Sequence, residues 1–211
     1  MVGPVEAVVC DFGGVLTTSL FEAFTKIQEE FGIEGQDLGA AMQLLSERND
    51  ENPLFPLERG EISEEAFLAE LGGALEEVLG REAHVHRFRH ALFDGLDPNP
   101  PMIELMRELR DRGLRMAMLT NNVREWEPLW RSMLPVDEIF EAVIDSGFVG
   151  CRKPEPRIYE LTVERIGVPF ERCLFVDDLE VNIAAAVELG MRAVRFESNE
   201  QAIPEIRAAL S

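Results

Sequence analysis

Four short stretches of the chain contain residues that could act on a phosphate-like group. They are Asp11 in Val-Cys-Asp-Phe-Gly-Gly, Thr120 in Met-Leu-Thr-Asn-Asn, Lys153 in Arg-Lys-Pro-Glu-Pro, and the adjacent pair Asp177 and Asp178. Each is weak evidence alone, because an aspartate after a strand is more often a helix cap and a Thr-Asn pair is common in turns. Their combination and order carry the stronger signal.

Together these residue types supply the parts of a phosphoryl-transfer site. A carboxylate such as Asp11 can form a covalent phospho-aspartate. A second carboxylate can help to hold Mg²⁺, which lets a negative nucleophile approach a negative substrate. A threonine hydroxyl can bind phosphoryl oxygens, and a lysine can neutralise charge on the nucleophile and the transferred group. The chain has 18 arginines and only two lysines, Lys26 and Lys153, so lysine at position 153 suggests a need for a compact charge.

The four stretches lie at the ends of apolar runs that are predicted to be strands. These runs cover residues 5–11, 114–119, 142–144, 173–176 and 191–196. Helical stretches separate the later runs, and this alternation predicts a mostly parallel sheet with right-handed crossovers. Ligands of such sheets bind at the carboxyl ends of the strands, so we expect the four stretches to form one site.

Residues 18–97 show no strand pattern and are expected to be helical. Ser19 with Glu22 predicts one helix start, Asp37 is expected to cap a second helix and Ser63 a third. The sequence therefore predicts an α/β core, residues 1–17 and 98–211, with an inserted all-helical cap, residues 18–97. The cap carries 18 acidic and 6 basic residues, a net charge of −12, against 22 and 14 in the core.

The 211-residue chain has an ordinary hydrophobic content of 46% but an unusual charge. Forty acidic residues against 20 basic ones give a net charge of −20, which excludes a general nucleic-acid binder and argues against docking on anionic membranes. The three cysteines lack metal-type spacing and are expected to be reduced thiols. The first residues show no signal-peptide pattern. We expect a cytoplasmic protein, a monomer or homodimer, with no nucleic-acid or membrane partner.

The four motifs, in this order and spacing, resemble the haloacid dehalogenase superfamily, in the branch with a helical cap after the first strand. The stretch from Val149 to Tyr159, Val-Gly-Cys-Arg-Lys-Pro-Glu-Pro-Arg-Ile-Tyr, is the most specific. With Phe-Val-Asp-Asp at 175–178 and Asn182, it is similar to the phosphatase domain of soluble epoxide hydrolases and to small bacterial sugar-phosphate phosphatases. The resemblance implies a Rossmann-like core and a Mg²⁺-dependent hydrolase of small phosphorylated metabolites, sugar phosphates among them.

The resemblance also assigns roles by position. Asp11 would be the nucleophile, and Mg²⁺ would be held by Asp11, the backbone carbonyl of Gly13 and Asp178. Asp177 would either contact these ligands without touching the metal or bind the metal through a water molecule. The phosphoryl group would be bound by three further residues, Thr120, Asn121 and Lys153, of which Lys153 also takes part in catalysis.

Position 13 departs from the pattern of the superfamily's phosphatases. These usually carry an aspartate there, which protonates the leaving alkoxide and then activates the hydrolytic water, whereas this chain has Gly13. Loss of general acid–base catalysis typically costs about 10² to 10⁴ in rate. Three interpretations stay open. The first is a phosphatase for substrates with a good leaving group, such as sugar 1-phosphates or acyl phosphates. The second is a 2-haloacid dehalogenase, although those have tyrosine at this position and need no metal. The third is a weak or inactive protein with a binding or regulatory role.

Overall fold

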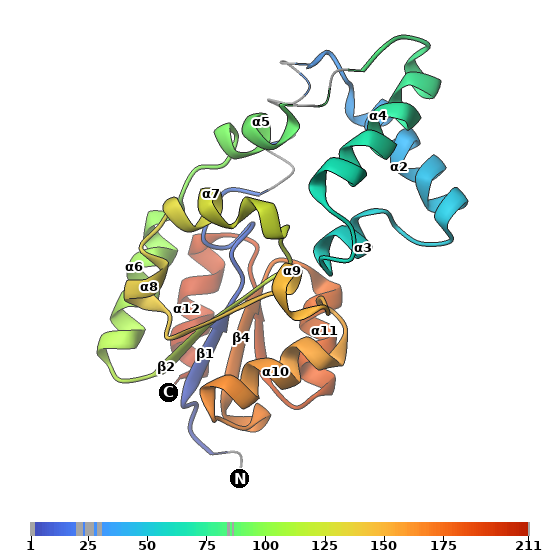
Figure 1. Cartoon of the computed structure of the whole chain (residues 1–211). Coiled ribbons are helices and arrows are strands. Elements are labelled where there is room, and N and C mark those ends of the chain that lie inside the picture. Colours follow the sequence, from blue (N-terminus) through green and yellow to red (C-terminus); the bar gives the residue numbers. More distant parts are fainter. Residues whose placement is uncertain are drawn as a thin grey trace.

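A five-stranded parallel sheet forms the centre of the computed structural model, which describes residues 3–19, 23, 28, 31–83, 85 and 87–210. The strand order is β3-β2-β1-β4-β5, so β1 lies in the middle (Figure 1). All four neighbouring pairs are parallel, as the sequence predicts. The strands are β1 (Ala7–Cys10), β2 (Arg115–Thr120), β3 (Ala142–Asp145), β4 (Cys173–Asp177) and β5 (Arg192–Arg195).

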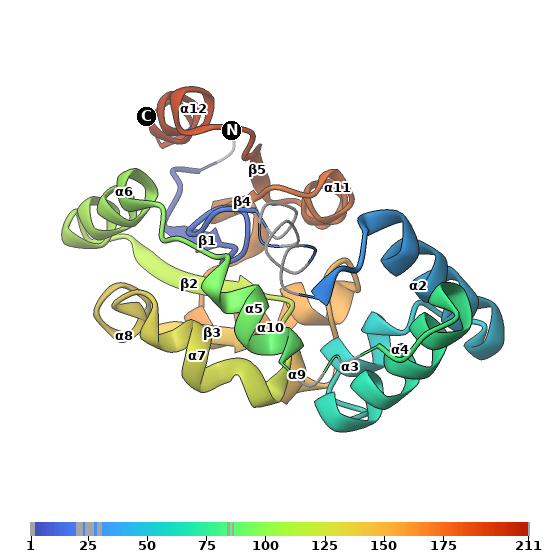
Figure 2. The same ribbon diagram turned by 90° about the horizontal axis from the view of Figure 1, so that it is seen from above.

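Helices cover both faces of the sheet, because its strands are apolar on both sides. In β1, Val8 and Cys10 pack into one hydrophobic cluster, while Ala7 and Val9 pack into another on the opposite face. The first cluster is covered by α6 (Pro100–Asp111) and α12 (Asn199–Ala209). The second is covered by α10 (Pro156–Ile166) and α11 (Glu180–Glu188) (Figures 1 and 2). The result is the Rossmann-like three-layer core that the sequence predicts.

Short helical elements lie in the connections between the strands and the longer helices of the core. Their bounds are η1 (Arg124–Trp126), α7 (Glu127–Ser132), α8 (Val136–Ile139), α9 (Ser146–Val149) and η2 (Phe170–Arg172).

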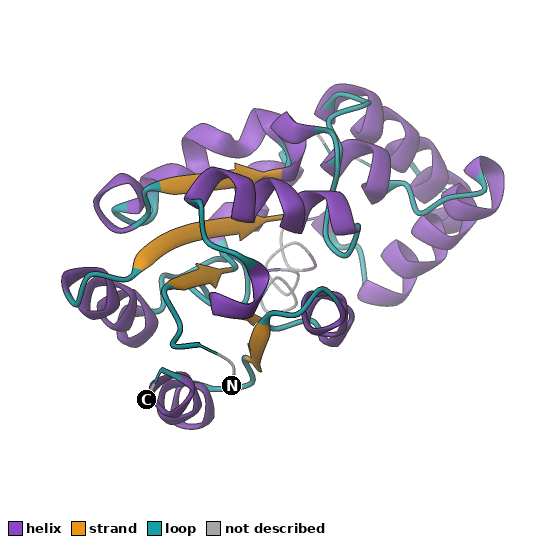
Figure 3. Ribbon diagram, turned by 90° about the horizontal axis from the view of Figure 1, so that it is seen from below, coloured by secondary structure: helices purple, strands orange, loops and turns teal. Residues whose placement is uncertain are grey.

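Every element between β1 and α6 in the described part of the chain is helical, which Figure 3 shows by colour. These helices are α2 (Gly35–Asn49), α3 (Leu54–Glu58), α4 (Glu64–Leu79) and α5 (Phe88–Asp94), and α2 packs beside α4 (Figures 1 and 2). Thr17 pairs with Pro98 in an isolated antiparallel bridge, so the two ends of the helical segment meet. We therefore keep residues 18–97 as the proposed cap.

The helix starts expected in the cap have different outcomes. Ser63 caps α4, because its Oγ accepts a hydrogen bond from the Ala66 N–H at 3.2 Å. The expectation for Asp37 is wrong: α2 begins at Gly35, and Asp37 lies inside its first turn, where a carboxylate also interacts favourably with the helix dipole. The helix expected from Ser19 and Glu22 falls largely outside the described residues.

Two further properties bear on the composition-based expectations. All three cysteines are buried and form no disulfide, as expected for free thiols. Within the described ranges, no helix combines the length and the apolar character needed to cross a bilayer.

Candidate active site

Three of the predicted residues meet at the carboxyl edge of the sheet because their strands are neighbours. Asp11 directly follows β1, Thr120 ends β2, and Asp177 ends β4. Cys10 pairs with Val176 of β4, so the next residues, Asp11 and Asp177, lie side by side. All three residues are almost completely buried, with exposures of 7% or less.

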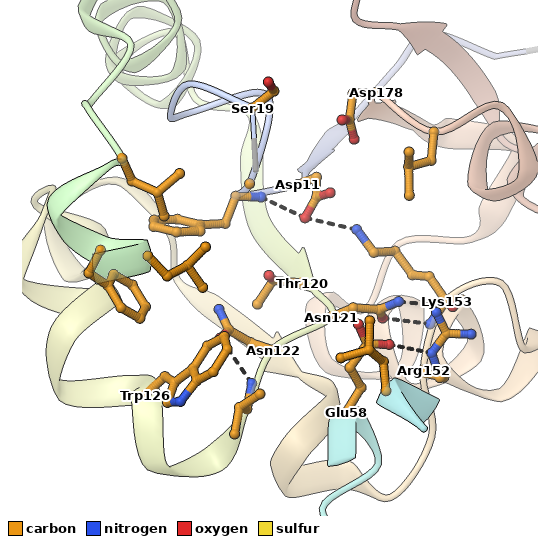
Figure 4. A pocket seen from close by; sticks show the side chains of 18 of the residues that line it. Asp11, Ser19, Glu58, Thr120, Asn121, Asn122, Trp126, Arg152, Lys153 and Asp178 are labelled. Carbon is orange, nitrogen blue, oxygen red and sulfur yellow. Dashed lines mark hydrogen bonds and ion pairs between the residues drawn. The ribbon is translucent and has the colours of Figure 1, made fainter. Parts of the chain in front are cut away.

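Lys153 reaches this edge from the loop after α9 and bridges two carboxylates. Its Nζ lies 2.8 Å from Asp11 Oδ1 and 2.7 Å from Asp177 Oδ2, and the residue is 1% exposed. Burial alone disfavours the charged ammonium, but the two carboxylates more than offset this and raise the pKa of Lys153 above its ordinary value. Lys153 is therefore a buried positive charge in contact with the candidate nucleophile (Figure 4).

Asn121 fixes the backbone of Lys153. Its Oδ1 accepts from the Lys153 N–H at 2.7 Å, and its Nδ2 donates to the Lys153 carbonyl at 2.9 Å. Both polar atoms of the side chain thus bind Lys153, which leaves the backbone N–H and the second hydrogen of Nδ2 as the donors of Asn121 that could bind a phosphoryl group. The sequence places Asn121 at the site but gives no sign of this positioning contact.

Asp11 has one oriented oxygen and one free oxygen. Its Oδ1 accepts from the Phe12 N–H at 2.7 Å and from Lys153, while Oδ2 makes no hydrogen bond with the described residues. Burial raises the pKa of Asp11 well above its ordinary value, the Lys153 ammonium opposes this, and the nearby Asp177 carboxylate adds to it. An additional positive charge would favour the ionised form that a nucleophile needs.

A cluster of carboxylates at this edge has the donor chemistry for a hard divalent cation. Oxygen atoms of Asp11, Asp177 and Asp178 all lie within 4.8 Å of one another. Burial raises the pKa of Asp178, and the charge of Asp177 raises it further. A Cβ on Gly14, whose φ is +76°, would lie 2.4 Å from Asp178 Oδ2, so the glycine makes room for this carboxylate. Three carboxylates around one lysine leave a negative charge that Mg²⁺ would balance.

Asp177 differs from the other two carboxylates because both its oxygens have protein partners. Oδ2 binds Lys153, and Oδ1 accepts from the Leu179 N–H and the Asn182 Nδ2, each at 2.9 Å. This leaves Asp11 and Asp178 with freer oxygens for a metal. Figure 4 shows Asp178 and Lys153 approaching Asp11 from different sides.

A cavity of about 430 Å³ extends from this edge to the helical segment. Its border includes Asp11, Gly13 and Lys153 on one side and apolar side chains of α2, α4 and α5 on the other. Glu58 of α3 also borders it and binds Arg152 of the core, with 2.5 Å between Oε2 and Nε (Figure 4). Sequence reasoning missed this ion pair, because its partners are 94 residues apart and only Arg152 lies in a recognisable motif.

Comparison with known proteins decides the family. A family model described as haloacid dehalogenase-like hydrolase matches residues 5–190. The chain belongs to this hydrolase family. The resemblance inferred from the four motifs is thereby confirmed.

Curated relatives of the hydrolase include several with phosphatase names. The chain is 29% identical over 208 residues, 97% of its length, to acyl-CoA dehydrogenase family member 10 of Mus musculus, and the match covers 19% of that protein. It is 33% identical over 118 residues, 54% of its length, to a glyceraldehyde 3-phosphate phosphatase of Pyrococcus abyssi, with 49% of that protein covered. The chain thus matches half or less of the length of these relatives.

Solved structures agree with the fold. A haloacid dehalogenase-family enzyme of Bacteroides thetaiotaomicron, in complex with magnesium and inorganic phosphate, has a TM-score of 0.63 to the hydrolase. The two are 23% identical, and the likeness covers 92% of this chain and 94% of the other. At this identity the likeness establishes the shared fold.

In the hydrolase, the space beside Gly13 is open. Apart from its two chain neighbours, no atom of the described residues lies within 4 Å of the position that a Cβ on Gly13 would occupy, and its φ is outside the left-handed region. A Cβ at this position would therefore meet no described neighbour. The missing acid–base group is a chemical difference from the usual pattern and does not follow from lack of space.

Proposed function

We propose that this hydrolase is a Mg²⁺-dependent phosphatase that acts on small phosphomonoesters through an aspartyl-phosphate on Asp11. The observation that carries the proposal is the buried ion-pair chain Asp11–Lys153–Asp177 at the sheet edge, with Asp178 beside it. A buried lysine ammonium beside the carboxylate nucleophile suits an anionic substrate, because the ammonium offsets the negative charge that the substrate adds to the site.

The chain's own residues supply orientation and charge for the first step. Asp11 Oδ2, free of hydrogen bonds to the described residues, attacks phosphorus while Oδ1 stays bound to Lys153 and the Phe12 N–H. The Lys153 ammonium offsets negative charge on the transferred group. The Thr120 hydroxyl and the Asn121 backbone N–H would bind phosphoryl oxygens. Mg²⁺, held by Asp11, the Gly13 carbonyl and Asp178, would neutralise the negative charge of the phosphate.

Gly13 limits the range of leaving groups. Without a carboxylate at this position, an ordinary alkoxide would leave unprotonated, so the missing acid by itself favours phosphates with a better leaving group, such as sugar 1-phosphates or acyl phosphates. In the second step water hydrolyses the aspartyl-phosphate, and a group on the cap or on the substrate would activate it.

The two alternatives make different predictions about metal. A 2-haloacid dehalogenase needs no proton for its halide and no metal. The cluster of three carboxylates has the donor chemistry of a metal site and therefore does not favour this alternative. A binding or regulatory protein would retain the site without turnover. The phosphatase name of the Pyrococcus relative and the magnesium and phosphate in the Bacteroides structure support the phosphatase. A small phosphorylated metabolite as substrate, a cytoplasmic location and a monomeric or dimeric state remain predictions.

The deciding experiment measures phosphate release from an aryl phosphate with and without Mg²⁺, beside chloride release from 2-chloropropionate without metal. We expect Mg²⁺-dependent phosphate release, and loss of it in Asp11→Asn with an unchanged circular-dichroism spectrum. Chloride release would establish the dehalogenase instead. Neither activity at high enzyme concentration would overturn the proposed function in favour of a binding role.

A further inference from the structure

The side of the cavity that faces Asp11 is formed by apolar side chains of the helical segment. These come from three helices, and six of them are Leu38 and Met42 of α2, Phe67 and Leu71 of α4, and Phe88 and Leu92 of α5. On the core side, Phe12, Val123 and Trp126 continue the same surface. The cavity thus joins a charged end at the strand edge to an apolar end between the cap and the core.

Several polar groups that border the apolar end already bind protein partners. Glu58 and Arg152 bind each other, and the guanidinium of Arg152 lies 3.9 Å from the ring centre of Phe55. The indole Nε1 of Trp126 donates to Glu64 Oε1 at 2.9 Å. A hydroxyl group placed against Glu58, Arg152 Nε or the Trp126 indole would have to compete with these contacts.

The composition of the cavity discriminates between classes of alcohol. Each methylene moved from water into an apolar site strengthens binding by about fourfold. A hydroxyl buried without a partner weakens it by roughly 5- to 150-fold. A sugar has a hydroxyl on most carbons, so it would bury few methylenes and several hydroxyls and would bind weakly. A hydrocarbon chain or ring would bind more tightly. A volume of about 430 Å³ lies within the range of pockets that enclose whole small ligands.

We propose that the preferred substrates are phosphate monoesters of hydrophobic phenols, or of hydrophobic alcohols with a comparably acidic hydroxyl, with the hydrocarbon group between the cap helices and Trp126. This inference rests on the proposed phosphatase function and specifies its substrate class. Hydrolysis consumes one water. The P–O bond to the alcohol breaks as Asp11 takes the phosphoryl group, the alcohol oxygen gains one proton of that water, and the phosphate receives the remaining hydroxyl.

The test uses phenyl phosphate and its 4-ethyl, 4-butyl and 4-hexyl derivatives, because para-alkyl groups lengthen the ester while changing the acidity of the phenol little. We expect kcat/KM with Mg²⁺ to rise by up to about fourfold per methylene until the cavity is filled. Of the near-isosteric pair 4-ethylphenyl and 4-(hydroxymethyl)phenyl phosphate, the ethyl ester should be hydrolysed at least about fivefold faster at low substrate concentration.

Two variants of α2 link the effect to the cavity. Met42 borders the cavity, whereas Leu44 is a partly buried apolar residue of the same helix that packs in the cap. Met42→Gln should lower kcat/KM for the 4-hexyl ester by a larger factor than for phenyl phosphate, which flattens the dependence on chain length, while Leu44→Gln keeps the wild-type dependence.

The outcomes separate the two proposals. Hydrolysis of phenyl phosphate with a flat or falling dependence on chain length would refute the hydrophobic substrate class and leave the phosphatase intact. A preference for the hydroxymethyl ester would refute it in the same way. Failure to hydrolyse any of these esters, with or without Mg²⁺, would overturn both proposals.

Discussion

Replacing Gly13 by aspartate should create the acid–base group that this site lacks. The structure accommodates the new Cβ, because no atom of the described residues beyond the two chain neighbours lies within 4 Å of it and the backbone is outside the left-handed region. The new carboxyl would lie close in sequence to Asp11 and near the carboxylates of Asp177 and Asp178. Their negative charges should raise its pKa, which favours the protonated form that a general acid needs.

The size of the gain should depend on the leaving group. General acid–base catalysis contributes about 10² to 10⁴ in rate, so Gly13→Asp should raise kcat for an alkyl phosphate by up to that factor. An aryl ester gains less, because its phenolate leaves with little protonation. The ratio of alkyl to aryl kcat should therefore rise in Gly13→Asp, measured by phosphate release with saturating Mg²⁺.

Gly13→Asn is the matched control, since it has nearly the same shape and cannot transfer the proton. It should show the wild-type ratio of alkyl to aryl kcat. An equal gain in Gly13→Asn, or no gain in a folded, Mg²⁺-binding Gly13→Asp, would refute the view that position 13 limits the leaving group.

Three further predictions follow from the buried charges. Lys153→Met should abolish turnover and lower the free energy of unfolding by about 3–5 kcal/mol in urea titrations without Mg²⁺, because it leaves buried carboxylates unpaired; an active Lys153→Met would contradict its role. Mg²⁺ at 100 times its Kd should raise the free energy of unfolding by about 2.7 kcal/mol, and Asp178→Asn should weaken this response; an equal response at equal Mg²⁺ concentrations would exclude Asp178 as a ligand. Burial raises the pKa of Asp145 to about 6, so the protonated carboxyl is favoured in the folded protein. The stabilisation that results is complete below pH ~4 and is lost as pH rises through about 6. In Asp145→Asn, the decrease in the free energy of unfolding between pH 4.5 and pH 7 should be smaller than in the wild type, by at most about 3 kcal/mol. An unchanged pH dependence would contradict this role of Asp145.

The strand edge could be predicted from sequence because each of its residues follows an apolar run. Asp11, Thr120 and Asp177 need only their strands to be parallel neighbours in order to meet, and strand–helix alternation predicts that arrangement. Lys153 was found through its motif. Its contacts with Asp11 and Asp177 depend on how the loop after α9 folds back, which local pattern does not encode.

Contacts between distant segments account for what the sequence left open. Asn121 and Lys153 are 32 residues apart, and an Asn after a strand is equally compatible with turn chemistry. Periodicity identifies the buried faces of α2 and α4, but it cannot distinguish a filled core from the wall of a cavity. Asp37 shows a similar limit, because acidic residues are common both at a helix N-cap and in the first turn.

The nucleophilic role of Asp11 is the central claim, and trapping the intermediate tests it most directly. Enzyme mixed with Mg²⁺ and an aryl phosphate should be quenched in acid within one turnover, digested and analysed by mass spectrometry. We predict a phosphoryl adduct on the peptide that contains Asp11, and neither adduct nor phosphate release in Asp11→Asn. An adduct on another residue, or phosphate release that persists in Asp11→Asn, would contradict the mechanism.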